Sequence, residues 1–444
     1  MKLSNISTLA GIFFSSLVTA QLSGTVGPTT STASKAATKV CNILNYGGVA
    51  STSTDNGPAI LAAWTACVAG GEVYIPAGNY GMSTWVTLTG GTGVAIRLDG
   101  ILYRTGTASG NMIFVEHTTD FEFFSSTSAG AMQGYGYVFH AAGTYGPRLL
   151  RLAQVVGFSI HDIALVDSPA FHLTLDTCSD GEVYNMIIRG GNEGGLDGID
   201  VWGTNIWVHD VEVTNKDECV TIKSPASYML VENIYCNWSG GSAFGSLGAD
   251  TDIHHITYDH IYTQNSNQML LLKSNGGSGS VYSCSFTNFM GHSNAYTLDL
   301  DGYWSSESTA TGDGVLYHDL TFSHWHGTCL NGGTRAAIQA LCPSGAPCYN
   351  IDIENFYIWT EAGSEVLYKD ENAYGTGGGL NTGTSYTAYA VVTKTVTSVP
   401  AASYAITTMA ADLTAGFAIS ASIPIPAVPT SFYPGLSPIS AKLG

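Results

Sequence analysis

Short apolar stretches separated by polar residues, without the period of an α-helix, extend from Val73 towards the end of the chain. Within them one unit recurs eight times: an apolar residue, any residue, a short polar Asn, Asp or His, and a second apolar residue. The units begin at Ile160, Val183, Val208, Val231, Tyr258, Phe286, Phe322 and Ile353. Successive units start 23, 25, 23, 27, 28, 36 and 31 residues apart. A period in the twenties built of strands predicts stacked coils, each burying its apolar faces on its neighbours.

The predicted fold is therefore all-β: a single-domain parallel β-helix, or solenoid, over residues 40–375. A β-propeller is the competing repeat fold, but each of its blades needs about 40 residues or more. We attribute the longer intervals late in the chain to loop insertions. The polar residue of each unit is expected to stack on its counterpart one coil away, as in an amide ladder.

One amphipathic helix is expected before the solenoid. The run Asp55-Asn56-Gly57-Pro58 predicts a turn into a helix over residues 59–66, and Gly70-Gly71 ends it. Residues 73–76 follow as a strand. The helix would cap the first coil, whose uncovered sheet edge would otherwise invite aggregation.

The two ends of the chain differ from the solenoid in composition. Lys2 precedes a short apolar run, which predicts a secretory signal peptide over residues 1–20. Residues 21–39 are rich in Ser, Thr and Gly and predict a flexible leader. Residues 376–444 predict an extended Ser/Thr/Ala/Pro-rich tail packed on the solenoid, with a disordered tail as the alternative. No later apolar stretch reaches the roughly 18 residues of a membrane span, so we expect a secreted, extracellular protein without a membrane anchor.

Charge and composition narrow the choice of partners. The net charge is −19 with only 15 Lys and Arg, which argues against the basic surface that nucleic-acid binding needs. Few charges, 53 Gly and 24 Tyr suit a carbohydrate-active protein. We expect a monomer without a cofactor or metal, since no CxxC and no histidine ligand pattern occurs. Asn237 lies in the one N-glycosylation sequon after the predicted signal peptide.

Nine cysteines in an oxidising compartment predict disulfides. Local spacing pairs Cys41 with Cys67, Cys219 with Cys236, and Cys342 with Cys348. The three cysteines left over would be small apolar core residues, namely Cys178, Cys284 and Cys329.

Four carboxylates lie within 22 residues, in two consecutive coils: Asp197, Asp200, Asp217 and Glu218. On a regular strand Asp217 and Glu218 would point to opposite faces, so both serve one cleft only if the backbone turns or bulges there. A bridge from Cys219 to the next coil would hold such a segment in place. A protonated and an ionised carboxyl that converge can cleave a glycosidic bond, one protonating the leaving oxygen and the other activating water.

These residues resemble the motifs of the pectin-cleaving glycoside hydrolases of family 28, and within them fungal rhamnogalacturonases more than polygalacturonases. Polygalacturonases carry Asn-Thr-Asp-Gly, Asp-Asp, Gly-His-Gly shortly before Gly-Ser-Val-Gly, and Arg-Ile-Lys. Here the corresponding segments are Gly195–Gly198, Asp217-Glu218, Gly240-Gly241 with Gly245–Gly248, and Leu271–Lys273. The acids and the lysine persist, whereas the histidine and arginine do not.

The resemblance implies a right-handed parallel β-helix that hydrolyses the rhamnogalacturonan I backbone of pectin between galacturonic acid and rhamnose, from within the polymer and with inversion. By position in the motif, Asp217 would be the general acid, Asp197 or Glu218 would activate water, and Asp200 would support them. Inversion predicts acid and base carboxyls roughly 6.5–9.5 Å apart. Loss of the family's arginine suggests that the sugar there lacks a carboxylate, as rhamnose does.

Further residues are expected to assist. Lys273 would neutralise a substrate carboxylate, and Lys216 and Lys223 lie near the acids in sequence, with salt bridges to the acid cluster as the alternative. His292 would replace the missing histidine in the cleft or be a hydrogen-bonded structural residue. Aromatic side chains expected to stack on sugars, unless they belong to the core, are Trp202, Trp238, Tyr303 and Trp304.

Other functions remain open at this point. A polygalacturonase is the nearest rival, a Ca²⁺-dependent pectin lyase cleaving by β-elimination is a second, and a non-catalytic glycan-binding solenoid is a third. Against a lyase, the cluster contains no convincing arginine base.

Overall fold

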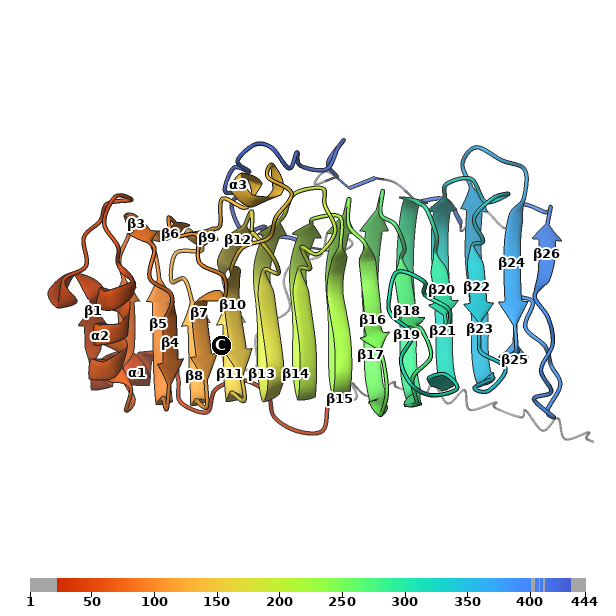
Figure 1. Cartoon of the computed structure of the whole chain (residues 1–444), viewed down its shortest axis with the longest axis horizontal. Coiled ribbons are helices and arrows are strands. Elements are labelled where there is room, and N and C mark those ends of the chain that lie inside the picture. The colour runs from red at the N-terminus through yellow and green to blue at the C-terminus, as the bar shows by residue number, and fades with distance from the viewer. Residues whose placement is uncertain (1–21, 401–403, 407, 410–411, 433–444) are drawn as a thin grey trace, which may run out of the picture.

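The computed structural model describes residues 22–400, 404–406, 408–409 and 412–432. The predicted signal peptide lies outside them. The described chain is a β-solenoid of about 11 turns, whose strands stack side by side from β1 at one end to β26 at the other (Figure 1). The predicted all-β solenoid is therefore confirmed. None of the helices in the described residues is long and apolar enough to cross a membrane.

The helices and strands occur in this order: α1 Thr32–Thr38, β1 Val40–Asn42, η1 Ile43–Tyr46, α2 Gly57–Cys67, β2 Glu72–Ile75, β3 Asn79–Met82, β4 Val86–Thr89, β5 Thr92–Leu98, β6 Ile101–Arg104, β7 Asn111–Glu116, β8 Thr119–Phe124, β9 Gly130–Gln133, α3 Tyr137–His140, β10 Arg148–Ala153, β11 Val156–His161, β12 Ile163–Val166, β13 Leu173–Arg189, β14 Ile199–Thr214, β15 Glu218–Asn237, β16 Gly241–Leu247, β17 Thr251–Gln264, β18 Leu270–Ser274, β19 Gly279–Asn294, β20 Leu298–Asp301, β21 Leu316–Cys329, β22 Ile338–Leu341, β23 Cys348–Thr360, β24 Val366–Glu371, β25 Ala373–Thr376 and β26 Val392–Val396.

The eight sequence units lie in register on neighbouring parallel strands. Val183 is paired with Val208, and Val208 with Val231, and the same register links all eight first positions from β11 to β23. The third residue of every unit has a positive φ, for example 52° at Asp210 and at Asn233. Asn, Asp and His tolerate this left-handed conformation better than most residues, so the unit marks the corner at which each coil turns.

The expected amide ladder at these corners forms only in part. Asn233 Nδ2 donates to Asp210 Oδ1 at 3.2 Å, whereas Asn288 Nδ2 bonds Asp259, which stands one position before the corner residue of its own coil. The main driving force for stacking is therefore the buried interior. There, Phe286 stacks on Phe322 with ring centres 5.0 Å apart, and Phe289 on Trp325 at 4.2 Å.

The three expected disulfides are present, Cys41–Cys67, Cys219–Cys236 and Cys342–Cys348. The other three cysteines, Cys178, Cys284 and Cys329, are free and buried, as predicted for core residues.

The N-terminal end is more ordered than the sequence suggested. Helix α2 lies at the expected place, and the disulfide from Cys67 ties it to β1. Residues 22–39, expected to be a flexible leader, instead lie along the coils from β15 back to the N-terminal end and contain α1. The fully buried Lys35 has its Nζ 3.3 Å from Asp120 and 3.6 Å from Glu122. Thr30 also hydrogen-bonds Asp120. The polar side chains of this segment therefore bind it to the solenoid instead of facing the solvent.

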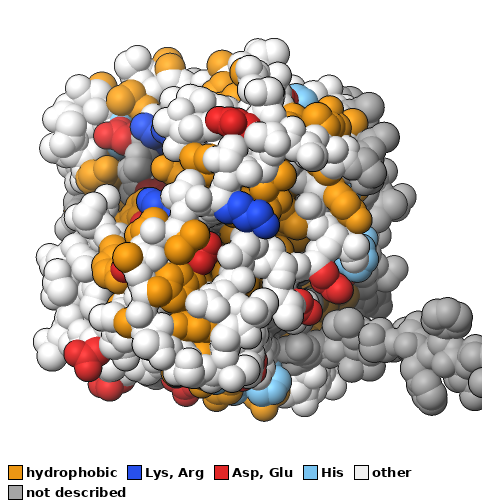
Figure 2. Space-filling view, turned by 90° about the vertical axis from the view of Figure 1, so that its right-hand side faces the viewer, with side chains coloured by type: hydrophobic (Ala, Val, Ile, Leu, Met, Phe, Trp, Pro, Cys, Tyr) orange, Lys and Arg blue, Asp and Glu red, His pale blue; other side chains and the backbone are white. Residues whose placement is uncertain are grey.

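The C-terminal tail packs on the solenoid. Strand β26 pairs antiparallel with β24 and so covers the last coil, and small groups of hydrophobic side chains are visible among polar ones when the solenoid is viewed from this end (Figure 2). Farther on, the tail runs back along the coils, where Ile423 is buried beside Val166 and Ile187.

The tail also buries the predicted glycosylation site. Asn237 is fully buried, and its Oδ1 accepts the Leu413 N–H at 2.9 Å. A glycan on Asn237 would therefore have to displace the tail from this position.

Candidate active site

The acids of the first coil are placed by β14 and the turn before it. Asp200 follows the buried Ile199 and precedes the buried Val201, so strand alternation turns Asp200 to the outer face of the sheet. Asp197 ends the Gly-rich turn, and its carbonyl accepts the His172 N–H at 3.0 Å. Both carboxyl groups are almost fully buried.

The acids of the next coil lie where the backbone is irregular, as the sequence required. Lys216 has φ of 144°, and the register of β15 against β16 shifts between Glu218 and Thr221. Asn215 Nδ2 donates to the Glu218 carbonyl at 2.9 Å, and Ser239 Oγ donates to the Asp217 carbonyl at 3.1 Å.

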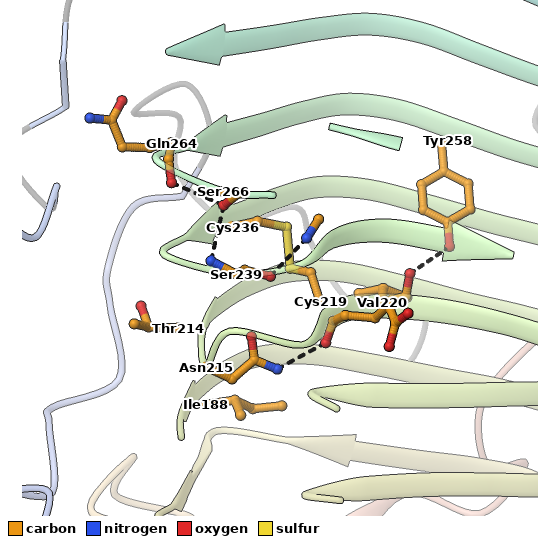
Figure 3. The surroundings of a disulfide bond; sticks show 12 residues. Ile188, Thr214, Asn215, Cys219, Val220, Cys236, Ser239, Tyr258, Gln264 and Ser266 are labelled. Carbon is orange, nitrogen blue, oxygen red and sulfur yellow. Dashed lines mark hydrogen bonds between the residues drawn. A yellow bond between two sulfur atoms is a disulfide. The ribbon is translucent and has the colours of Figure 1, made fainter. Parts of the chain in front are cut away.

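The disulfide beside the acids fixes this bend from the next coil (Figure 3). Cys219 follows Glu218 directly, and Cys236 lies at the end of β15 next to the turn that carries Ser239. The Val220 carbonyl accepts the Tyr258 hydroxyl at 3.0 Å. Because both ends of the irregular segment are held, Asp217 and Glu218 face one cleft although they are neighbours in sequence.

Three carboxylates meet in this cleft. One oxygen each of Asp197, Asp217 and Glu218 lie within 4.8 Å of one another, an arrangement that a metal cation could also use. Two lysines already supply positive charge there. Lys223 Nζ lies 3.3 Å from Asp200 and 3.6 Å from Asp197, and Lys273 forms an ion pair with Glu218.

The carboxyls are closer together than inversion led us to expect. Inversion, which the family resemblance implies, predicts roughly 6.5–9.5 Å between acid and base, whereas one oxygen of each carboxyl lies within 4.8 Å of the others. Two features draw them in: the Gly195 N–H donates to Asp217, and the two lysines screen the remaining negative charge. Within the cluster, the side chains of Asp217 and Glu218 are close enough to hydrogen-bond each other.

Burial and mutual contact separate the protonation states of the adjacent acids. Burial raises the pKa of Asp217 to about 7, and the hydrogen bond and charge of Glu218 act in the same direction. Burial alone would also raise the pKa of Glu218. The hydrogen bond from Asp217 and the two lysine ammonium groups outweigh burial and hold the pKa of Glu218 at about 2. The pair thus holds one proton, on Asp217, over the acidic and neutral range.

Asp197 and Asp200 are influenced by the same burial and the same neighbouring charges. Burial, followed by the charges of Asp200 and Glu218, raises the pKa of Asp197 well above its usual range. Burial also raises the pKa of Asp200, and Lys223 opposes that shift. Although burial alone would lower the pKa of Lys223, the surrounding carboxylates raise it, so this lysine stays charged.

The cleft has a volume of about 410 Å³. It is lined by Gly194, Asp217, Glu218, Gly240, Asn267, Gln268, Leu271, Lys273, Trp304, Ser306 and Glu307. Lys273 Nζ lies 5.8 Å from the centre of the Trp304 ring. Of the side chains expected to bind substrate, the structure brings Lys273 and Trp304 to the cleft, and Lys223 to the acids beneath it.

Three other expected residues lie elsewhere. His292 Nε2 is 3.2 Å from Glu361, which fits the structural alternative. Trp238 Nε1 donates to the Leu413 carbonyl of the tail, so its placement in the groove is wrong. Lys216 is exposed and forms no ion pair within the described residues.

Sequence reasoning missed part of the cleft wall. Ser306 and Glu307 belong to the loop between β20 and β21, which makes the interval from Phe286 to Phe322 the longest of the seven between units. Asn267 and Gln268 belong to the turn before β18. The long insertion that contains Trp304 was the one feature of the sequence that could have pointed to Glu307.

Known proteins resemble this chain in both sequence and structure. The profile described as "Glycosyl hydrolases family 28" matches residues 72–372. Rhamnogalacturonase A of Aspergillus aculeatus is 64% identical over 428 residues, covering 96% of this chain and 97% of that protein. A probable rhamnogalacturonase A of Aspergillus niger is 61% identical over 425 residues, covering 96% and 95%.

Solved structures share the fold. Endo-xylogalacturonan hydrolase from Aspergillus tubingensis superposes with a TM-score of 0.66 at 21% identity, covering 73% of this chain and 94% of that one. A polygalacturonase from Erwinia carotovora ssp. carotovora gives 0.57 at 17% identity, covering 77% and 96%. The match over the solenoid and the identity to rhamnogalacturonases confirm the resemblance seen in the acid motifs, and the chain belongs to glycosyl hydrolases family 28.

Proposed function

We propose that the protein is a secreted endo-hydrolase of the rhamnogalacturonan I backbone of pectin, cleaving between galacturonic acid and rhamnose. The observation that carries the proposal is the Asp217–Glu218 pair, in which burial gives one carboxyl a pKa of about 7 and contact holds the other at about 2. The high identity to proteins named rhamnogalacturonase supports the choice of polymer.

The reaction follows from the protonation states. Asp217 keeps its proton and donates it to the glycosidic oxygen as the carbon–oxygen bond breaks. Glu218 stays ionised, and with Asp197 it holds the water that attacks the anomeric carbon. The proton of that water passes to the carboxylate base, and a later exchange with solvent restores Asp217. Attack from the face opposite the leaving oxygen inverts the anomeric centre.

The paired lysines favour a neutral sugar near the reacting bond. Lys223 and Lys273 are engaged by the site's own carboxylates, so neither is free to grip a uronate as an unpaired arginine would. Trp304 offers an aromatic wall in the same cleft. This arrangement suits rhamnose and argues against a polygalacturonase, which must bind uronates on both sides of the bond.

Secretion and a monomeric state belong to the same proposal. The apolar run after Lys2 and three disulfides support passage through an oxidising compartment.

One experiment tests the substrate. The protein is incubated with deacetylated rhamnogalacturonan and, separately, with homogalacturonan, and the products are sized by gel filtration. We expect early, random shortening of rhamnogalacturonan, no shortening of homogalacturonan, and full activity in EDTA. Preferential cleavage of homogalacturonan would establish a polygalacturonase, and Ca²⁺-dependent unsaturated ends a lyase. Binding without shortening of either polymer would establish a glycan-binding solenoid.

A further inference from the structure

Two arginines lie on β10, upstream of the acids on the same sheet. Arg151 is paired in register with Thr174, and Thr174 with Asp200, so the arginine is two rungs from the acid. Two strand spacings place these backbone positions about 10 Å apart. Arg151 lies between the buried Leu150 and Leu152 and therefore points to the outer face, as Asp200 does.

Arg148 opens the same strand and is partly exposed. Its guanidinium lies over the Phe171 ring, 5.0 Å from the ring centre. Burial lowers the pKa of Arg148 and the charge of Arg151 lowers it further, while Asp200 and Asp197 act in the opposite direction. The two arginines are thus close to each other, and Arg148 is within electrostatic reach of the acids.

The charges of this arginine pair are not balanced by the protein. Arg151 lies over Phe114 and forms an ion pair with Asp176 at 2.5 Å. Arg148 has no carboxylate in ion-pair distance within the described part of the chain, and its buried Nε has no hydrogen-bond partner there. Two neighbouring guanidinium groups, of which only Arg151 is paired with a carboxylate, leave a net positive charge in a chain whose total is −19.

We infer that Arg148 and Arg151 form a remote subsite for the carboxylate of a galacturonate residue, separated from the scissile bond along the groove. This inference rests on the proposed function. It identifies the place where the enzyme binds the acidic sugars of a polymer in which galacturonate and rhamnose alternate. Lys223 and Lys273 are already paired, so Arg148 supplies the free planar donor that a carboxylate binds in a bidentate manner. The rings of Phe171 and Phe114 contact the two guanidinium groups and limit their movement.

The subsite also explains how an acidic enzyme retains an acidic polymer. The overall charge repels the substrate, and a local positive patch in the groove offsets that repulsion where the chain must lie. Because the groups are partly exposed, salt should weaken this contribution.

Binding to a catalytically silent protein tests the subsite. Asp217→Asn provides the background, and Arg148→Gln, Arg148→Lys and the control Lys394→Gln on the distant strand β26 are added singly. Each protein is titrated calorimetrically with rhamnogalacturonan oligosaccharides and with the same oligosaccharides whose carboxylates have been reduced to alcohols. We expect Arg148→Gln to weaken binding of the native ligand about tenfold or more, Arg148→Lys to weaken it less, and Lys394→Gln to leave it unchanged. All four proteins should bind the reduced ligand equally.

Two results overturn the inference. If Arg148→Gln loses as much affinity for the reduced ligand as for the native ligand, Arg148 only supports the fold. If Arg148→Gln loses no affinity for the native ligand, no carboxylate binds at this position. Wild-type turnover of rhamnogalacturonan is measured alongside. If turnover is present and the arginine variants have no effect, only the subsite is wrong, whereas absence of turnover overturns the proposed function and the subsite with it.

Discussion

Replacing the proposed acid by its amide, Asp217→Asn, should abolish catalysis and stabilise the protein at neutral pH. A carboxyl whose pKa is raised from 3.8 to about 7 by folding is protonated in the folded state and ionised in the unfolded state between these values. The unfolded state therefore binds fewer protons, so this group makes the wild type less stable as pH rises from about 4 to 7. An asparagine carries no such cost, and its amide can still donate to Glu218 as the protonated carboxyl does.

The size of the effect follows from the shift. A difference of about 3 pKa units corresponds to at most about 4 kcal/mol above pH 7, and solvent access to part of the side chain reduces it. At pH 4 the same substitution removes almost none of this cost. For a domain of roughly 400 residues, about 3 kcal/mol shifts Tm by about 3 to 4 °C.

The assay compares thermal unfolding of wild type and Asp217→Asn by calorimetry at pH 4 and at pH 7.5, at fixed ionic strength. Contacts that do not titrate, such as the hydrogen bond from Gly195, contribute equally at both pH values and cancel in the difference. We expect the variant to gain stability relative to wild type only at pH 7.5. A stability difference that is the same at both pH values would refute the protonated state assigned to Asp217.

Three further outcomes are expected. The pH profile of kcat should fall as pH rises through about 7, where Asp217 loses its proton; a profile still rising at pH 8 would contradict the assignment. Lys273→Met should leave Glu218 as a buried carboxylate without its main cation and cost about 3 to 5 kcal/mol of stability, with the loss shrinking as pH falls from about 4.5 to about 2, where wild-type Glu218 also takes up its proton; Lys394→Met serves as its control and should change little. Replacing both Cys219 and Cys236 by serine should lower kcat at least tenfold more than replacing Cys342 and Cys348, because only the first disulfide holds the bend that aims Asp217 and Glu218; equal losses would show that the bridge acts on the fold alone.

The fold could be predicted from the sequence because each corner of the solenoid requires a particular kind of residue. Each coil needs a residue with positive φ, and Asp210 and Asn233 supply it at intervals that equal the length of a coil. The acids stand at different offsets from the units of their two coils, so the meeting of Asp197 and Glu218 depends on the shift in register between Val201 and Gly203, which the sequence does not mark. In contrast, the irregular backbone at Asp217 was required once both neighbours had to face one cleft.

The features that could not be predicted depend on contacts between segments far apart in the chain. Such contacts produce no local pattern in the sequence. The tail covers Asn237 and engages the half-buried Trp238, since Leu413 bonds to both. Lys35 anchors a segment whose composition alone suggests flexibility. Arg148 carries no motif, and its relation to Asp200 appears only when the strands between them are laid in register.

The stereochemistry of the first product tests the acid–base pair most directly. Deacetylated rhamnogalacturonan is digested in the spectrometer, and proton resonances of the newly formed galacturonate reducing ends are followed before mutarotation. Delivery of water by Glu218 and Asp197 opposite the proton donor Asp217 predicts new ends whose anomeric configuration is inverted relative to the cleaved bond. Ends with retained configuration would contradict it, as would unsaturated ends or the absence of new ends.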